Sequence, residues 1–397
     1  MEKPKIRFKG YQEDWEQRKL EDYLEVSNEK NRDELFGKED VLSVSGEVGI
    51  VNQIEFQGRS FAGASVANYG IVEVGDVVYT KSPLKSNPYG IIKTNKGKTG
   101  IVSTLYAVYK PKENVDSEFV QIYFESDFRM NSYMHPLVNK GAKNDMKVSD
   151  ANALKGPVFF PKIEEQIAIS QYFNSLDHLI TLHQRKCEEM KTLKKYMLQK
   201  MFPQNGQSVP QIRFSGFTED WEQRKFSDIA ARESSVSTSA SDIPSVEYED
   251  VVAEEGRLNK DIRLKEAVKS GITFDGSQVL YGKLRPYLHN WLNPDFKGIA
   301  VGDWWVLKPI NMDKNFLYRL IQTQQFDNIA NQSSGSKMPR ADWNLISNSE
   351  FMAPFSKEEQ SKIGRYFDSF DHLITLHQQK CDELRNIKKF MLQNMFI

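Results

Sequence analysis

The sequence has few cysteines, no long apolar run and no excess of charge of one sign, and each shortage excludes a class of protein. Two cysteines among 397 residues cannot build the disulfide framework of a small secreted domain. No apolar stretch approaches the roughly 18–20 residues that span a bilayer, and the first residues lack the apolar region of a signal peptide. We therefore expect a soluble cytoplasmic protein. Lysine plus arginine is 53 and aspartate plus glutamate is 54, so any nucleic-acid surface must be local.

Motifs of catalysis are scarce as well. The sequence has no GxxxxGK[ST] phosphate loop, no GxGxxG after a predicted strand, and no HExxH, GxSxG or CxxC. Residues 293–296 read Asn-Pro-Asp-Phe, one residue away from the Asn-Pro-Pro-Tyr/Phe tetrad of base-modifying methyltransferases, but no glycine-rich cofactor loop accompanies them. We expect no catalytic residue and no cofactor on this chain. A deviant methyltransferase is the enzyme alternative.

Two segments of the chain occur twice, in the same order. EDWEQRK at 13–19 returns 206 positions later, and DHLITLH at 177–183 returns 194 positions later. The stretches 26–140 and 232–334 share little. Such repetition indicates an internal duplication whose copies are related by a pseudo-twofold. We therefore expect one repeated frame that carries two different middle domains.

A helix of about 38 residues is predicted after each middle domain. Between Pro161 and Pro203 there is no glycine or proline, acidic residues come first, and lysines come last. At 1.5 Å per residue such a helix is about 57 Å long. The second copy covers 357–396. We expect an antiparallel pair that acts as a spacer; the alternative is that each helix packs on its own domain or on another protein.

Apolar residues recur along both helices in steps of three and four, which predicts a seam between them. Lys194 interrupts the seam, and we expect Leu193 to fill the gap. His183 and Cys187 have a zinc-ligand spacing that the second copy repeats, but a free cysteine packs as a small apolar side chain, so we predict no metal. The predicted seam consists of Leu176, Ile180, His183, Cys187, Met190, Met197, Phe370, Ile374, His377, Cys381, Leu384 and Met391.

The fold class predicted from these patterns is α+β, with two mixed α/β domains joined by the two antiparallel helices. Trp15 and Trp221, in the repeated EDWEQRK, are expected to anchor each domain to the helices. Strands are predicted at 72–79, 101–109, 278–283 and 299–307, and helices at 117–134 and 313–330. The predicted segments of the chain are 1–160, 161–204, 205–355 and 356–397.

Positive charge is concentrated in a few stretches of the middle domains. Residues 81–112 hold seven lysines and no acidic residue. Basic, glycine-containing loops follow at 139–147 and 335–340, and another basic loop lies at 283–290. Such loops suit DNA phosphates and base edges, although a solvated lysine-rich face is the alternative. The residues predicted in this way to contact DNA are Lys81, Lys85, Lys93, Lys96, Lys98, Lys143, Asn144, Lys147, Lys283, Arg285, His289, Lys337 and Arg340.

Two such readers on one frame would recognise two short sequences separated by an unread gap. The chain resembles the specificity (S) subunit of bacterial type I restriction–modification systems. The resemblance covers the whole chain and is carried by RFxG(Y/F)xEDWEQRK in both copies, GIVSTLYAVYKP at 100–111, KLRPYL at 283–288, GSKMPRADWN at 335–344 and the repeated helix. It adds Tyr287, Ser336 and Met338 to the predicted DNA contacts.

The resemblance implies that the chain is not an enzyme. It would direct adenine methylation and restriction by partner subunits to a bipartite, asymmetric DNA target. The implied partners are double-stranded DNA, two methyltransferase (modification) subunits and restriction/translocase subunits, with no membrane. S-adenosylmethionine, ATP and Mg²⁺ would belong to those subunits. The alternatives are a standalone DNA-binding regulator and a scaffold protein without DNA contact.

Overall fold

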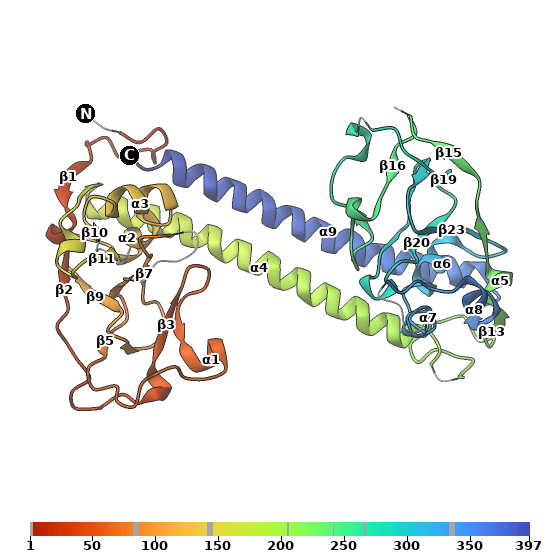
Figure 1. Cartoon of the computed structure of the whole chain (residues 1–397), viewed down its shortest axis with the longest axis horizontal. Coiled ribbons are helices and arrows are strands. Elements are labelled where there is room, and N and C mark those ends of the chain that lie inside the picture. The colour runs from red at the N-terminus through yellow and green to blue at the C-terminus, as the bar shows by residue number, and fades with distance from the viewer. Residues whose placement is uncertain are drawn as a thin grey trace. The chain divides into compact units, whose positions relative to one another are not determined.

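The computed structural model describes residues 3–81, 87–140, 146–204, 206–240, 242–265, 267–332 and 338–397. Contacts divide the chain into two units, Met1–Leu182 with Lys380–Ile397, and His183–Gln379. The two long helices of Figure 1, α4 (Ile163–Met201) and α9 (Lys357–Asn394), each contribute to both units. They have 39 and 38 residues, close to the predicted 38. The predicted division into four successive segments stays a prediction.

The first unit is built on a four-stranded antiparallel sheet. Its strands and short helices are β1 (Glu16–Lys19), β2 (Leu24–Val26), β3 (Leu42–Ser45), β4 (Gly49–Asn52), α1 (Gln53–Gln57), β5 (Gly70–Val72), β6 (Val77–Thr80), β7 (Ile92–Thr94), β8 (Gly100–Val102), β9 (Tyr106–Pro111), α2 (Ser117–Tyr123), α3 (Asp127–Met134), β10 (Asn139–Lys140), β11 (Met146–Lys147) and β12 (Pro157–Phe160). The sheet order is β2-β9-β6-β7, and β3-β4, β5-β8, β10-β11 and β1-β12 form separate antiparallel pairs.

The end of the chain completes the core of the first unit. Trp15, Phe119 and Phe173 are buried, and the ring of Phe396 lies 6.1, 5.8 and 6.0 Å from theirs. Arg129 stacks over the ring of Phe396 at 4.7 Å and donates a hydrogen bond to the backbone at the end of α9. Residues 380–397 therefore belong to a unit whose other residues come from the first half of the chain.

The second unit contains two four-stranded sheets. Its strands and short helices are β13 (Glu222–Lys225), α5 (Phe226–Ile229), β14 (Ala230–Glu233), β15 (Val236–Thr238), β16 (Ser245–Val246), β17 (Val251–Val252), β18 (Arg257–Leu258), β19 (Ser270–Phe274), β20 (Val279–Gly282), β21 (Trp291–Leu292), β22 (Gly298–Ala300), β23 (Trp304–Pro309), α6 (Lys314–Leu320), α7 (Gln324–Ala330), α8 (Trp343–Asn348) and β24 (Glu350–Ala353). The sheet orders are β14-β23-β20-β21 and β15-β19-β22-β16, with β13-β24 and β17-β18 as separate pairs.

Turns divide several elements that were predicted as single pieces. The strand predicted at 72–79 is split into β5 and β6 at Gly75, and the strand predicted at 299–307 is split into β22 and β23 at Gly302. Both glycines have a positive φ, +92° and +100°, which glycine adopts at little cost and which ends a strand. The predicted strand at 101–109 is likewise two strands, β8 and β9.

The predicted helices 117–134 and 313–330 are each two helices for a related reason. The side chain of Ser126 caps α3 by accepting from Arg129 N, and Thr323 caps α7 by accepting from Phe326 N. A hydroxyl that satisfies a free backbone N–H begins a new helix and so ends the previous one. The sequence pattern located the helical regions but not these breaks.

Within the first unit the long helices run antiparallel. Cys381 Sγ lies 3.6 Å from Ile180 O, and Lys388 Nζ lies 2.7 Å from Asp177 Oδ1. Residue numbers therefore rise along α9 as they fall along α4, which confirms the predicted direction of pairing.

The same arrangement recurs within the second unit. His183 Nδ1 lies 2.9 Å from His377 Nδ1, and Lys194 Nζ lies 2.6 Å from Asp371 Oδ1. The predicted seam residues Leu176, Ile180, Cys187, Phe370, Ile374, Cys381 and Leu384 are buried, and His183, Met190, Met197, His377 and Met391 are half-buried. The helix pair is thus formed twice from equivalent residues.

The expectation that Leu193 fills a gap beside Lys194 is wrong. Leu193 is 41% exposed, whereas Lys194 is only 8% exposed. The aliphatic stem of a lysine can occupy a seam position while its ammonium pairs with a carboxylate, here Asp371. Burial nevertheless lowers the pKa of Lys194. Burial also acts to lower the pKa of Lys388, but the carboxylates of Glu125 and Asp177 raise that pKa overall.

Repeated contacts attach the start of each copy to its unit. We call residues 3–19 and 209–225 the lead segments. Arg7 Nε lies 2.7 Å from Glu165 Oε1, and Arg213 Nε lies 2.7 Å from Glu359 Oε1. Trp15 and Trp221 are both buried in their units. Identity between the copies at these positions therefore coincides with the same Arg–Glu contact and a buried tryptophan in each unit.

Candidate DNA interface

Two loops of the second unit that carry predicted DNA contacts lie side by side. We call segments 283–289 and 338–341 the paired loops. Arg285 N donates to Pro339 O at 2.7 Å, and Ala341 N donates to Lys283 O at 2.8 Å. Between these two hydrogen bonds, Leu284 and Arg340 form an isolated β-bridge. Backbone pairing of this kind fixes the position of both loops relative to the sheet that carries them.

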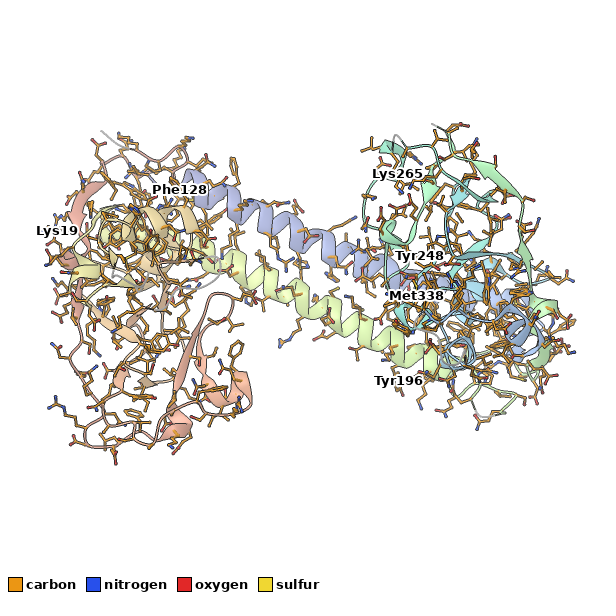
Figure 2. All side chains as sticks on the ribbon, in the orientation of Figure 1. Lys19, Phe128, Tyr196, Tyr248, Lys265 and Met338 are labelled. Atoms are coloured by element: carbon orange, nitrogen blue, oxygen red, sulfur yellow. The ribbon has the colours of Figure 1, made fainter. Side chains whose placement is uncertain are left out.

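The side chains at the tip of the paired loops face solvent. Arg285 is exposed, Tyr287 is 52% exposed and Met338, labelled in Figure 2, is 46% exposed. Arg285 and His289 have left-handed backbones, with φ of 49° and 52°. Left-handed non-glycine residues cost of order 1–3 kcal/mol and concentrate at ligand-binding sites. The loop thus combines exposed side chains with a backbone held in an uncommon conformation.

Two cations of the paired loops share one carboxylate. Arg340 Nη2 lies 3.0 Å from Asp303 Oδ2, and Lys283 Nζ lies 3.4 Å from Asp303 Oδ1. The hydrogen bond from Arg340 lowers the pKa of Asp303, so the carboxylate stays charged at neutral pH. Asp303 holds both cations beside the exposed tip and leaves a net charge of about +1. No sequence pattern indicated Asp303, because it precedes strand β23 and is distant in the chain from both cations.

His289 is half-buried and held by carboxylates of its own unit, and its assignment as a DNA contact stays a prediction. Its Nδ1 lies 3.2 Å from Glu254 Oε1, its Nε2 lies 2.9 Å from Asp327 Oδ1, and its ring stacks on Trp291 at 5.3 Å. Both ring nitrogens are engaged by carboxylates of the same unit.

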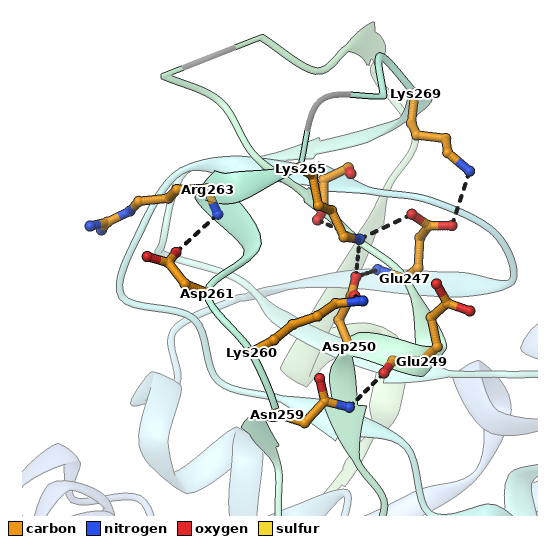
Figure 3. A network of polar contacts seen from close by, with 10 residues as sticks. Glu247, Glu249, Asp250, Asn259, Lys260, Asp261, Arg263, Lys265 and Lys269 are labelled. Atoms are coloured by element: carbon orange, nitrogen blue, oxygen red, sulfur yellow. Dashed lines mark hydrogen bonds and ion pairs between the residues drawn. The ribbon is translucent and has the colours of Figure 1, made fainter.

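A network of carboxylates and lysines surrounds Asp250 in the second unit (Figure 3). Lys265 Nζ lies 3.0 Å from Glu247 Oε1 and also binds Asp250, whose side chain is fully buried. Lys260 Nζ lies 2.9 Å from the other oxygen of Asp250. Tyr248 follows Glu247 in the chain, and its hydroxyl accepts a hydrogen bond from Leu284 N at 3.1 Å. The loop is thus connected to the interior of the unit.

We expect acid to weaken this network. Although burial acts to raise it, hydrogen bonds from Lys265 and Lys260 lower the pKa of Asp250, and the hydrogen bond from Lys265 lowers that of Glu247. Carboxylates with a lowered folded pKa stabilise the fold above their unfolded values, about 4, and that contribution is lost as the pH falls through the lower folded values. Urea unfolding of the wild type and of Asp250→Asn from pH 7 to pH 3 tests this. If the free energy of unfolding fell below pH 4 with the same slope in both proteins, the predicted contribution of Asp250 would be contradicted.

In the first unit the fold distributes the lysines of the basic run over different surroundings. Lys93 is 7% exposed, and burial lowers its pKa, so its assignment as a DNA contact is corrected. Lys81 Nζ lies 3.0 Å from Asp150 Oδ1, and Lys96 Nζ donates to Asn174 on α4 at 2.8 Å. Among the described lysines of this run, Lys93 is therefore buried, and Lys81 and Lys96 are held by residues of their own unit.

Several predicted contacts are not placed by the structure. Lys98 is exposed on the turn between β7 and β8, and its assignment stays a prediction. Lys147 lies in β11, but its side chain is outside the description. The predicted contacts Lys85, Lys143, Asn144, Ser336 and Lys337 lie outside the described residues.

Within the described ranges, no three histidine, cysteine, aspartate or glutamate side chains gather as a metal site. The zinc alternative at His183 and Cys187 therefore gains no support, and the absence of a metal stays a prediction. In the same part of the chain, no helix is both long and apolar enough to cross a membrane.

One family model and one curated relative match parts of this sequence. Residues 218–386 match the family model of the type I restriction modification DNA specificity domain. The type I restriction enzyme MjaX specificity subunit of Methanocaldococcus jannaschii is 23% identical over 228 residues, which are 53% of this chain and 51% of the relative. The match thus spans about half the length of that relative.

Two solved structures share the fold over nearly the whole chain. The S subunit of the type I restriction–modification system from M. genitalium superposes with a TM-score of 0.65 at 12% identity, over 100% of this chain and 99% of that one. A chain from a structure of type I restriction–modification complex assembly and conformational transition gives 0.51 at 14% identity, over 96% and 97%. Residues 218–386 thus resemble the type I restriction modification DNA specificity domain, and the chain as a whole shares its fold with an S subunit of a type I restriction–modification system.

Proposed function

We propose that the chain reads a bipartite, asymmetric DNA target, with one half-site for each unit. The observation that carries the proposal is a repeated frame with dissimilar recognition segments. Both copies keep the Arg–Glu contact of the lead segments, whereas KLRPYL at 283–288 corresponds to KSPLK at 81–85 in the first copy. Equal frames with different reading loops suit a target whose two halves differ.

The helix pair supports a fixed gap between the half-sites. α4 is continuous for 39 residues, about 58 Å at 1.5 Å per residue. Both long helices contribute to both units, and partly buried ion pairs join the two helices within each unit. We propose that this pair is the spacer that determines how many base pairs remain unread.

Partner subunits would supply the chemistry. Apolar residues stay exposed at equivalent positions of both helices, including Leu179 with Leu373 and Leu193 with Ile387. Two equal apolar surfaces fit two copies of one modification subunit. S-adenosylmethionine, for adenine methylation, and ATP with Mg²⁺, for restriction, would be bound by partners in the cytoplasm. A standalone DNA-binding protein is the alternative, and it would bind its site without them.

Mapping methylated adenines across a genome tests the proposal. Cells that carry this chain with its modification subunits should methylate adenines in two short words separated by a constant gap, and cells without the chain should not. A single continuous word would contradict the bipartite reading. Methylation by the purified chain alone would establish the deviant methyltransferase instead.

We expect Arg285→Ala to weaken recognition of one half-site only. An arginine that binds a guanine edge contributes about 1–3 kcal/mol, or roughly 5- to 150-fold in affinity. Competition binding with the complex and DNA altered in one half at a time measures the effect. Lys297→Ala is the matched control, because Lys297 is an exposed cation of the same unit that pairs with Asp242. Equal loss at both half-sites would argue against separate readers.

A further inference from the structure

The backbone around Arg340 is fixed by the paired loops. Arg340 forms the isolated β-bridge with Leu284, and the residues before and after it, Pro339 and Ala341, each take part in a backbone hydrogen bond to the other loop. The side chain of Arg340 nevertheless stays 52% exposed. Because its backbone is held, the direction of its guanidinium decides what it can bind.

One edge of the Arg340 guanidinium is occupied by Asp303. Arg340 Nε lies 3.3 Å from both carboxylate oxygens of Asp303, and Arg340 Nη2 lies 3.0 Å from Oδ2. A guanidinium carries five N–H donors in a rigid planar fork. A carboxylate bound along the Nε and Nη2 edge therefore orients the fork and leaves its Nη1 and Nη2 end as two parallel donors.

Asp303 is in turn fixed by the fold. It follows Gly302, whose φ of +100° turns the chain between β22 and β23. The backbone oxygen of Asp303 accepts a hydrogen bond from Lys283 N at 2.9 Å, and its carboxylate also pairs with Lys283 Nζ. Three segments of the chain thus meet around one carboxylate. An arginine supported in this way loses less conformational freedom when it binds a ligand.

The sequence of the first copy does not repeat this arrangement. By the 194-residue offset, position 340 corresponds to Met146. Strand β9 has the place in its sheet that β23 has in the other, and the turn before β9, residues 103–105, reads Ser-Thr-Leu without a carboxylate. What Arg340 recognises therefore belongs to one half of the target.

The free end of the Arg340 fork matches the edge of a guanine. In the major groove guanine presents O6 and N7 side by side, and it is the base that offers two neighbouring acceptors there. A phosphate can also accept from a guanidinium, but it is an anion and would lie close to the charged carboxylate of Asp303, which repels it. The neutral guanine edge does not meet this repulsion.

We propose that Arg340, positioned by Asp303, reads a guanine in one half-site of the DNA target. This inference rests on the proposed function and names a base that the second unit recognises. Arg340 contacts the base through its Nη1 and Nη2 donors. Asp303 is a positioning residue, which acts on the base through the orientation of Arg340.

Duplexes with 7-deazaguanine test the proposal. In this analogue a C–H group replaces N7, so that one acceptor is lost while base pairing is kept. Methylation mapping first gives the target, and each guanine of it is then replaced in turn. Competition binding uses the full-length chain in complex with its modification subunits. Replacement of one guanine in one half-site should weaken binding of the wild-type complex roughly fivefold or more, whereas the Arg340→Lys complex should bind both duplexes within about twofold.

Asp303→Asn tests the positioning role. The amide has nearly the size of the carboxylate but lacks the charge that pairs with Arg340. The ratio of affinities for the native and the replaced duplex should fall toward one, and Asp303→Asn added to Arg340→Lys should change that ratio no further. A merely structural role for Asp303 would weaken binding to both duplexes equally, and an unchanged ratio would overturn the positioning role.

Arg257→Lys is the matched control, because Arg257 Nε likewise lies 2.7 Å from a carboxylate of the same unit, that of Glu255. This variant should keep the wild-type ratio. Melting temperatures show that each variant is folded, and if Asp303→Asn melts early, Arg340→Lys alone decides.

Three results would overturn the inference and leave the proposed function standing. They are a bipartite target without a guanine sensitive to the replacement, sensitivity that persists in Arg340→Lys, and an equal loss on every duplex in Arg340→Lys, as expected for a phosphate contact. A single continuous target word would overturn both the inference and the proposed function.

Discussion

Replacing Phe396 by alanine should lower the unfolding free energy of the first unit by about 3–5 kcal/mol, although Phe396 is the penultimate residue of the chain. Its ring is buried against Trp15, Phe119 and Phe173, and Arg129 stacks on it. Removal of a buried phenyl ring loses transfer free energy and leaves a cavity that the surrounding rings fill only in part. Denaturant unfolding followed by tryptophan fluorescence measures the loss.

Phe390→Ala is the matched control for this prediction. Phe390 lies on the same helix and in the same unit but is 54% exposed. Its replacement should change the unfolding free energy by no more than about 0.5 kcal/mol. Equal effects of the two substitutions would show that the end of α9 does not complete the core.

Replacing Asp371 by alanine should cost about 3–5 kcal/mol in the second unit, because two buried cations depend on this carboxylate. Asp371 Oδ1 lies 2.6 Å from Lys194 Nζ, and Asp371 Oδ2 lies 2.7 Å from Arg319 Nη1. Arg319 keeps Asp368, but Lys194 is left as a buried ammonium with its pKa already lowered by burial. Urea unfolding at pH 7 measures the loss.

The equivalent substitution in the first unit provides an internal comparison. Asp177→Ala removes one partner of Lys388, which keeps Glu125 at 2.9 Å. We therefore expect a smaller loss than for Asp371→Ala, with both proteins still folded. If Asp177→Ala lowered the free energy of unfolding as much as Asp371→Ala or more, Glu125 would not be compensating for the loss of Asp177.

The repeat and the long helices were predictable from the sequence because they depend on local information. An uninterrupted run between Pro161 and Pro203 with regular apolar spacing predicts a helix, and α4 begins at Ile163 and ends at Met201. Antiparallel pairing followed from the duplication. The exceptions were positions such as Lys194, where a polar residue on the seam found a partner on the other helix.

The paired loops were predictable in part. The sequence indicated the segments around Lys283 and Arg340, and the structure joins them by backbone hydrogen bonds. No pattern in the sequence indicated that Asp303 would pair with both cations, that both ring nitrogens of His289 would meet carboxylates, or that Lys93 would be buried. Charge counted along a chain does not distinguish the two faces of a strand.

The sequence by itself determined the duplicated frame, the two continuous helices and the absence of catalytic motifs, because repetition, periodicity and composition are properties of neighbouring residues. Only the tertiary structure decided that residues 380–397 complete the first unit and that the identical side chains of the lead segments have different partners in the two copies. Such contacts join positions far apart in the chain, and they form because burial and charge pairing act between whichever surfaces the fold brings together.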